Sequence, residues 1–340
     1  MPVSASAKAQ FGKILVDDDF FLFRPLKQYR TNANIIILRT EIPVILDTGT
    51  FNNPPMQRVL ATLQKYAISP DSIRYLIITH GHQDHFQNLP QFQQEFSRAQ
   101  TICHKDDVTS VQDPYHLPSG FNEYRGIHNR SLFFSGPFFK AYSFFFYRNW
   151  GRQFKVDCII TQDTCISLGQ DSIHLIHTPN HSKGQIIVLD NRKNLFLSDM
   201  VPFTPYIEIS DTAIDKIMKS TERILQFDEA HVKRAIRAHG DIRRPEWEIA
   251  PWGEEKARFR SFLETIHKTI DFIPDMLKNR QLTTEQLTQR IIPNYLRYSK
   301  WITLFFMPPA ITWTISYVLK LQREGKIHAI YKAHQCYWTN

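Results

Sequence analysis

The chain has 340 residues, of which 42% are hydrophobic and 22% are charged. This composition is that of a globular protein, and it excludes disorder, a collagen helix or a coiled coil as descriptions of the whole chain. The formal net charge of +8 is compatible with an anionic partner, but the basic residues are spread along the chain. That spread favours an ordinary basic surface.

The cysteines and the apolar segments indicate the compartment. The four cysteines are scattered and form no CxxC pair, which predicts free thiols in a reducing compartment. No apolar run opens the chain, and no stretch reaches the ~20 apolar residues of a membrane span. We therefore expect a cytoplasmic protein without a membrane span.

The first third of the chain alternates strand and helix patterns. Two apolar, β-branched runs within 33–47 predict two buried strands, and apolar residues at helical spacing predict a helix over 54–68. The run 75–79 predicts a short buried strand, 89–96 a helix and 101–104 another strand. This alternation is typical of a layered α/β protein.

Residues 111–155 interrupt this alternation with a segment rich in phenylalanine, tyrosine and tryptophan. After this segment, strand patterns resume at 159–160, 173–176, 186–189 and 195–197. A helix is then predicted over 213–228. We interpret the aromatic segment as an insertion between two strand-forming regions.

A change in composition near residue 241 predicts a linker or an extended return over 241–255, followed by a mostly helical tail. We place the domain boundary after residue 250, which gives domains of 1–250 and 251–340. The predicted elements of the tail are a helix over 259–273, a helix opened by the capping box Thr283-Thr284-Glu285-Gln286, a helix over 314–324 stopped by Gly325, and a hairpin within 327–338.

The strongest chemical signal is an HxHxDH pattern directly after the strand predicted at 75–79. It places three imidazoles and a carboxylate within six residues, at His80, His82, Asp84 and His85. Imidazole is the usual zinc ligand, and a carboxylate beside it suits a second, more oxygen-rich site. A solvated polar loop is the alternative, and four ligand-type side chains at this spacing argue against it.

Three further ligand-type residues follow apolar runs late in the chain. His181 comes after the strand predicted at 173–176, Asp199 after the strand at 195–197, and His239 after the run 235–238. Each of them alone is more often a structural residue than a ligand. Their joint order along the chain is what makes them candidates.

The HxHxDH loop, a TPxH element, a strand that ends in aspartate and a final His-Gly together resemble the metallo-β-lactamase fold superfamily over about residues 1–245. The resemblance implies a four-layer αββα sandwich with a binuclear metal site along one edge of its two sheets. Asp47 in ILDTG looks like the structural aspartate below the metal loop. The ligands carried over are His80, His82 and His181 for one ion, Asp84, His85 and His239 for the other, and Asp199 as the bridge.

Two departures from the family pattern replace glycines near the metals. Gln87-Asn88 stands where Gly-Gly or Gly-Asn is usual, and the TPxH element is TPNH rather than TPGH. Both changes touch the backbone geometry near the ligands and remove no ligand. We expect the remaining histidines near strands, His104, His174 and His177, to be structural.

The resemblance also implies a mechanism. Two divalent ions hold a hydroxide that attacks a carbonyl, with zinc the default for a histidine-rich site and iron or manganese the alternatives. Asp84 would orient the nucleophile and pass on a proton. Tyr206 would place its hydroxyl near the developing oxyanion, the alternative being a tyrosine packed on a surface loop.

The predicted substrate is a small molecule with an ester, thioester or lactone bond and a hydrophobic acyl part. In this fold the insertion 111–155 would lie over the site as an apolar lid, and the alternative is a domain or homodimer interface. A hydrolase of such a substrate and an endoribonuclease of this family would share every metal ligand, so the ligands do not distinguish the two functions.

The tail 251–340 resembles the winged-helix-like domain of lactamase-like hydrolases that include endoribonucleases. Its scattered lysines and arginines make a metal-dependent endoribonuclease the alternative function. The very apolar segment 301–313 favours instead a brace for the metal domain. A non-catalytic metal-binding or interaction protein is a third hypothesis.

Overall fold

The structure is a computed structural model, and it describes residues 13–25, 32–51, 54–113, 115, 127, 141, 153–200, 209–239, 248–291, 300–332 and 335–340. For residues 300–310 only the helical backbone is described. Within these ranges, no helix combines the length and the apolar character that crossing a membrane requires.

Seven strands form the first sheet, in the order in which they occur along the chain. The first four are antiparallel neighbours and the rest run parallel. The strands are β1 (Ile14–Val16), β2 (Phe20–Phe23), β3 (Ile35–Leu38), β4 (Val44–Leu46), β5 (Tyr75–Ile77), β6 (Gln100–His104) and β7 (Cys158–Ile160). The connections contain α2 (Met56–Lys65), the short 3₁₀ helix η1 (Pro70–Ser72), α3 (Gln83–Phe86), α4 (Leu89–Glu95) and α5 (Val108–Gln112).

Six strands form the second sheet, in the order β13-β12-β11-β10-β9-β8. They are β8 (Thr164–Leu168), β9 (Asp171–His177), β10 (Ile186–Asp190), β11 (Asn194–Ser198), β12 (Arg234–Arg237) and β13 (Ile249–Pro251). All neighbours are antiparallel except β11 and β12, which run parallel. As a result, the residues that follow β11 and β12 arrive at the same edge of the sheet.

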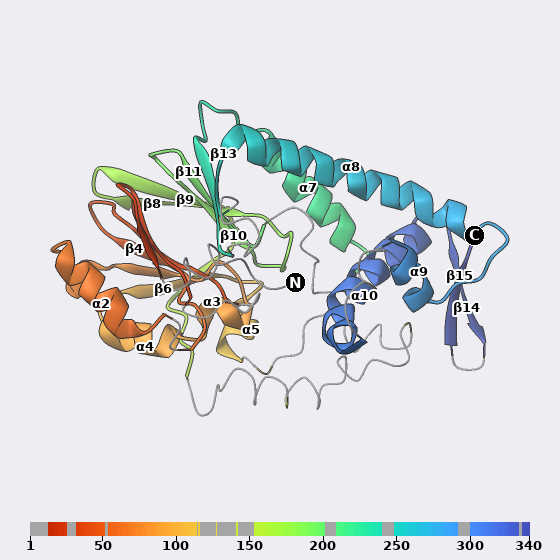
Figure 1. The fold of residues 1–340 in the computed structure, drawn as a ribbon, viewed down its shortest axis with the longest axis horizontal. Coiled ribbons are helices and arrows are strands. Elements are labelled where there is room, and N and C mark those ends of the chain that lie inside the picture. The colour runs from red at the N-terminus through yellow and green to blue at the C-terminus, as the bar shows by residue number, and fades with distance from the viewer. Residues whose placement is uncertain are drawn as a thin grey trace.

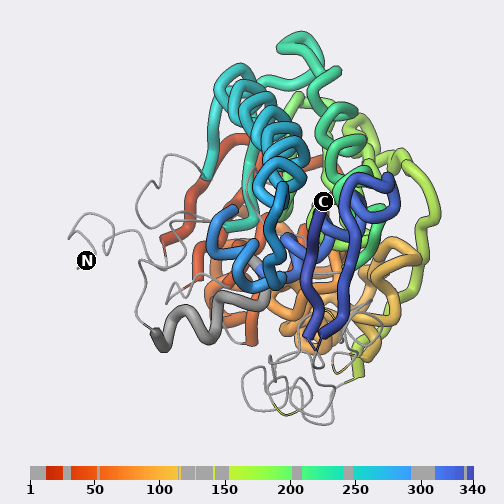
Figure 2. Tube along the Cα trace, turned by 90° about the vertical axis from the view of Figure 1, so that its right-hand side faces the viewer, coloured from red at the N-terminus to blue at the C-terminus, as the bar shows by residue number. Residues whose placement is uncertain are grey.

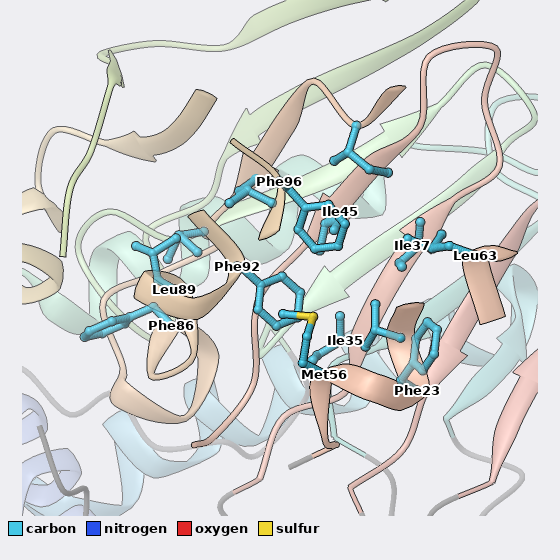
Figure 3. Packing of buried hydrophobic residues seen from close by; sticks show 14 of the residues in the cluster. Phe23, Ile35, Ile37, Ile45, Met56, Leu63, Phe86, Leu89, Phe92 and Phe96 are labelled. Carbon is cyan, nitrogen blue, oxygen red and sulfur yellow. The ribbon is translucent and has the colours of Figure 1, made fainter. Parts of the chain in front are cut away.

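The two sheets pack face to face, and helices cover their outer faces (Figure 1). In β2, Phe20 and Leu22 join the cluster between the sheets, whereas Phe21 and Phe23 point outward to the cluster under α2 and α4 (Figure 3). Every residue of β2 is buried because successive side chains alternate between two covered faces. The second sheet is covered by α7 (Ala213–Leu225) and the start of α8 (Trp252–Leu277). The predicted αββα sandwich is confirmed.

The tail consists of the rest of α8, α9 (Thr284–Ile291), α10 (Lys300–Arg323) and the hairpin β14 (His328–Lys332) and β15 (Gln335–Thr339). Leu282 pairs with Trp338 through reciprocal backbone hydrogen bonds of 3.1 and 2.8 Å, which join the chain before α9 to the hairpin. Figure 2 shows the hairpin beside these helices.

The helix signals of the tail are confirmed. The Thr283 backbone N–H donates to Gln286 Oε1 at 3.0 Å, and the Gln286 N–H donates to Thr283 Oγ1 at 3.2 Å, which is the reciprocal geometry of a capping box. Gly325 follows α10 with a φ of +69°, a conformation in which a side chain would be strained.

The tail and the sandwich share two helices. Trp252 and Phe259 at the start of α8 pack on the second sheet, while the remainder of α8 belongs to the cluster of the tail. Ile214 and Ile217 of α7 also join that cluster. Ile127, within the aromatic insertion, packs against the same cluster. The boundary after residue 250 stays a prediction.

The structure differs from the sequence prediction in three places. Within 241–255, predicted as a linker or an extended return, β13 is an extended strand that returns antiparallel to β12, and the first turn of α8, which was not predicted there, follows it. The last helix begins at residue 300, not 314, so it continues through Pro308 and Pro309. Strands β1, β2, β8 and β13 were not predicted.

Candidate metal centre

Four of the predicted ligands follow β5: His80 and His82 lie in the loop before α3, and Asp84 and His85 lie within α3 itself. Thr79 lies in the same loop directly before His80, and its carbonyl accepts a hydrogen bond of 2.9 Å from the backbone N–H of Ile186, at the start of β10. The loop is short, because α3 begins at Gln83. Since Thr79 follows β5 of the first sheet, the ligand loop starts where the edges of the two sheets meet.

His80, His82 and His181 form the first group of ligand atoms. His80 Nε2 lies 2.9 Å from His82 Nδ1, and the rings of His82 and His181 meet edge to face with centroids 4.5 Å apart. One ring nitrogen from each of the three lies within 4.8 Å of the other two. Three imidazoles arranged in this way can share one cation.

Asp84, His85 and His239 form the second group, again with ligand atoms within 4.8 Å of one another. Asp84 Oδ2 lies 3.3 Å from His239 Nε2 and 3.9 Å from His85 Nε2. His85 is fully buried, and the His239 side chain is 25% exposed. This second group is thus the more acidic and the more open to solvent.

Asp199 lies between the two groups. Its Oδ2 is 3.5 Å from His181 Nε2. Its Oδ1 is 3.5 Å from His85 Nε2 and 3.2 Å from His239 Nε2. Each carboxylate oxygen therefore faces a different group, which is the arrangement that a bridging ligand needs.

The imidazoles of the first group are neutral at physiological pH. Burial lowers the pKa of His80 well below its usual value, lowers that of His82 to about 3, and also lowers that of His181. For His80 and His82, neighbouring imidazoles lower the pKa further. Neutral imidazole is the form that binds metal.

The second group has the opposite electrostatics. Burial disfavours the charged imidazoles, but the carboxylates of Asp47 and Asp199 outweigh it and raise the pKa of His85 well above the usual value. Asp199 and Asp84 likewise raise the pKa of His239 to about 10. Burial alone would raise the pKa of Asp84 and Asp199. The imidazoles of His85 and His239 outweigh burial, so both pKa values are lowered. The two imidazoles therefore lie beside three carboxylates, those of Asp84, Asp199 and Asp47.

Contacts behind the ligands fix which ring nitrogen faces the site. The Nδ1–H of His85 donates to Asp47 Oδ2 at 2.7 Å, and the Nδ1–H of His239 donates to the Asn32 carbonyl at 3.1 Å. Both rings therefore present Nε2 to the other ligands. Asp47 also accepts from the N–H and the hydroxyl of Thr79, at 2.8 and 2.9 Å. Asp47 thus lies behind the metal loop, as the resemblance implies.

Sequence reasoning missed two hydroxyl side chains behind the site. Ser198 Oγ lies 2.6 Å from Thr79 Oγ1 and 3.3 Å from His80 Nδ1. Ser198 also has a φ of +52°, a conformation that costs a non-glycine residue about 1–2 kcal/mol. The signal that could have found both residues is position, because Thr79 directly precedes His80 and Ser198 directly precedes Asp199.

The donor set fits divalent cations. His85 Nε2 and Asp199 Oδ1 are buried, and within the described part of the chain neither forms a contact with hydrogen-bond geometry. Buried polar atoms without partners cost about 1–3 kcal/mol each, and a coordinated ion would remove that cost. Imidazole and carboxylate donors suit zinc, iron or manganese.

A separate cluster, formed by His104, Asp106 and His177, does not have metal-site geometry. The two rings stack face to face, with centroids 3.8 Å apart and an interplanar angle of 14°. Because nitrogen lone pairs lie in the ring plane, stacked rings direct them side by side and not onto one point. His177 Nε2–H donates to the Lys183 carbonyl at 2.8 Å, so this pair supports the loop that carries His181.

Tyr206 and all but a few residues of the aromatic insertion lie outside the described residues. The oxyanion role of Tyr206 and the lid role of the insertion therefore stay predictions.

The chain is similar to known proteins. A family described as the metallo-beta-lactamase superfamily matches residues 28–239. The protein named acyl-coenzyme A thioesterase MBLAC2 from Homo sapiens is 26% identical over 249 residues, covering 67% of this chain and 80% of the relative. The protein of the same name from Bos taurus is 25% identical over 262 residues, with the same coverage.

Two solved structures share the fold over nearly the whole chain. A metallo-beta-lactamase family protein from Thermus thermophilus has a TM-score of 0.69 at 11% identity, covering 96% of this chain and 100% of its own. A beta-lactamase domain protein from Burkholderia ambifaria has a TM-score of 0.70 at 12% identity, covering 97% and 94%. At these identities, the likeness concerns the fold alone.

Proposed function

We propose that this chain cleaves the thioester of an acyl-coenzyme A at a two-metal site. The chain belongs to the metallo-beta-lactamase superfamily and is a hydrolase with that fold. The observation that carries the two-metal proposal is the position of Asp199, whose two carboxylate oxygens face two separate ligand groups. The names of the two mammalian relatives support the thioester among the ester, thioester and lactone substrates considered.

The proposed ligand sets follow the two groups. His80, His82 and His181 would hold one ion, and Asp199 would bridge to the other. The second ion would be held by Asp84, His85 and His239. Zinc is the proposed metal because histidine predominates, with iron and manganese as alternatives.

Two divalent ions held by these residues would supply an activated water near neutral pH and would polarise the scissile carbonyl. The chain itself supplies orientation. Asp84 is anionic, and its side chain is 14% exposed, so it can accept a proton from water and return it to the leaving thiolate. Asp47 and the Asn32 carbonyl hold His85 and His239 in fixed orientations.

We also propose that the tail is winged-helix-like and braces the sandwich. Helices α8, α9 and α10 are followed by a hairpin, and Leu282 forms an isolated β-bridge to Trp338 of that hairpin, which supports this assignment. The basic side chains at the end of α10 are paired: Lys320 and Arg323 contact Asp215 of α7. Lys326 contacts Glu324 at 3.0 Å. Such pairing supports a brace over a phosphate-binding surface.

The test combines metal content with thioester hydrolysis. The variants are Asp199→Asn and the matched control Asp211→Asn, whose side chain is 45% exposed. Elemental analysis after metal repletion should find two ions per chain in the wild type and in the control. Asp199→Asn should lose at least one ion, and its release of thiol from long-chain acyl-coenzyme A should fall about 100-fold or more.

The failures of this test are separable. Fewer than about one ion per wild-type chain would contradict the metal site. Two ions without thiol release, together with cleavage of simple esters, would contradict the thioester assignment. Cleavage of RNA with binding that weakens steeply with salt would favour the endoribonuclease.

A further inference from the structure

The carboxylate of Asp107 contacts both of the loops that carry the first group of ligands. Asp107 follows β6 directly before α5 and is only 1% exposed. Its Oδ2 accepts from the Gly81 N–H at 2.8 Å and from the Ser182 hydroxyl at 2.6 Å. Its Oδ1 accepts from the Gly184 N–H at 2.9 Å. One side chain thus joins chain segments that are about a hundred positions apart.

These contacts surround the ligands closely. Gly81 lies between His80 and His82, and Ser182 follows His181 directly. The second group is held by other contacts, which are the bonds from His85 to Asp47 and from His239 to the Asn32 carbonyl. The two groups therefore depend on different supports.

The glycines in the two loops permit this close approach. A Cβ on Gly184 would lie 2.6 Å from Asp107 Cγ and 2.7 Å from Asp107 N. A Cβ on Gly81 would lie 2.8 Å from Ser110 Cβ and 3.3 Å from Asp107 Cβ. Contacts below 3.0 Å force atoms to move, so the Gly184 loop packs against Asp107, and the Gly81 loop against Ser110 of α5, as closely as glycine allows. Neither glycine has a positive φ, so packing, and not backbone conformation, requires them.

We propose that Asp107 is a positioning residue that holds the His80–His82 loop against the His181 loop and so assembles the first metal group. This inference rests on the proposed metal-dependent function. Because backbone N–H groups approach both oxygens, only a carboxylate satisfies them. In Asp107→Asn, either orientation of the amide turns an NH₂ group toward a backbone N–H. The two loops would then separate or shift.

The experiment measures metal affinity, which does not depend on turnover. His239→Ala removes a ligand of the second group and keeps the first, so this background is expected to retain one tightly bound ion. Adding Asp107→Asn should weaken that ion's affinity by about 10- to 100-fold, as loss of outer support does at metal sites. Adding Asp18→Asn, a change at an exposed carboxylate between β1 and β2, should leave the affinity unchanged.

A milder variant guards against misfolding. Ser182→Ala removes one donor from Asp107 Oδ2 and keeps both backbone bonds, so it should weaken the ion's affinity less than Asp107→Asn does. Zinc affinity is measured by competition with a chromophoric chelator, and the melting temperature of each metal-free variant is recorded.

Two results would overturn the role of Asp107. One is unchanged zinc affinity in Asp107→Asn. The other is that, in the wild-type background, Asp107→Asn weakens the binding of both ions equally and in proportion to the fall in melting temperature. That pattern indicates general destabilisation. If the wild type itself takes up no zinc, the metal site is overturned and the role of Asp107 falls with it. Zinc uptake without thioester cleavage would overturn the substrate and leave the role of Asp107 standing.

Discussion

The two ligand groups should respond differently to pH when they take up metal. The first group is already neutral, since the pKa of His82 is about 3 and those of His80 and His181 are lowered. In the second group, His239 has a pKa of about 10 and His85 has one well above its usual value. These two imidazoles must lose their protons before they can bind a cation.

The magnitude follows from proton linkage. Below its pKa, each proton that is released on binding makes the apparent affinity rise tenfold per pH unit. Two protons from His85 and His239 give about a hundredfold per unit, while the lowered pKa values of Asp84 and Asp199 mean that the carboxylates release none. The affinity of the first ion should be nearly flat with pH. Acidic solutions should therefore favour a one-metal form with the ion in the first group.

The assay is calorimetric titration of the metal-free protein with zinc between pH 5.5 and 6.5. A zinc-bound water has a pKa near 7, so its ionisation contributes little in this range. Repeating the titration in buffers with different ionisation enthalpies counts the protons released. We expect about none for the first ion and about two for the second, and His239→Gln should reduce the second count to about one. Equal pH slopes for the two ions would refute the electrostatic assignment.

Three other predictions concern stability and support. Asp47→Asn leaves an NH₂ group facing Thr79 or His85. The unfolding free energy, measured by denaturation, should therefore fall by about 1–3 kcal/mol. The second ion should bind about 10- to 100-fold more weakly in chelator competition. Glu255→Ala removes a fully buried carboxylate that pairs with both Arg237 and Arg258, and it should cost about 3–5 kcal/mol in urea denaturation. The exposed Glu254→Ala should cost under about 0.5 kcal/mol. Hydrogen bonds to the tail lower the pKa of Asp215 in the folded protein below its unfolded value near 3.8. The contact therefore stabilises the fold at pH values above 3.8, and this stabilisation is lost as the pH falls through the folded-state pKa. Asp215→Asn should therefore cost under about 1 kcal/mol at pH 7 and nothing near pH 2, in melts at both pH values.

The candidate ligands could be picked out from the sequence because their signal is local. Four of them lie within six residues of the chain, and each later ligand follows an apolar run. Their convergence was supplied by the family resemblance. In the structure it arises because β11 and β12 are parallel neighbours, so that Asp199 and His239 leave adjacent strand ends. No pattern in the sequence states that these two strands pair.

The supporting residues were harder to predict for a physical reason. Asp107 acts through backbone N–H groups of glycines, which carry no side-chain signal. Strand β2 was missed because both of its faces are buried, so the run Phe20–Phe23 shows no polar alternation. The start of α10 was misplaced because Pro308 and Pro309 usually mark a helix boundary.

The residues that stand in place of glycine near the metal loop form hydrogen bonds there. Asn88 is 1% exposed, and its Nδ2 donates to the carbonyls of Thr48 and Thr50 at 2.9 and 2.6 Å. Gln87 Oε1 accepts from the Phe51 N–H at 2.9 Å. A Gly-Gly pair could make none of these bonds, and a Gly-Asn pair could make only those of the asparagine. The bonds tie the segment after Asp47 to the end of the metal loop. The φ of Asn180 is not positive, so the conformation at the TPNH position does not require glycine either. Both departures from the family pattern are thus compatible with the ligand geometry, and the first strengthens its support.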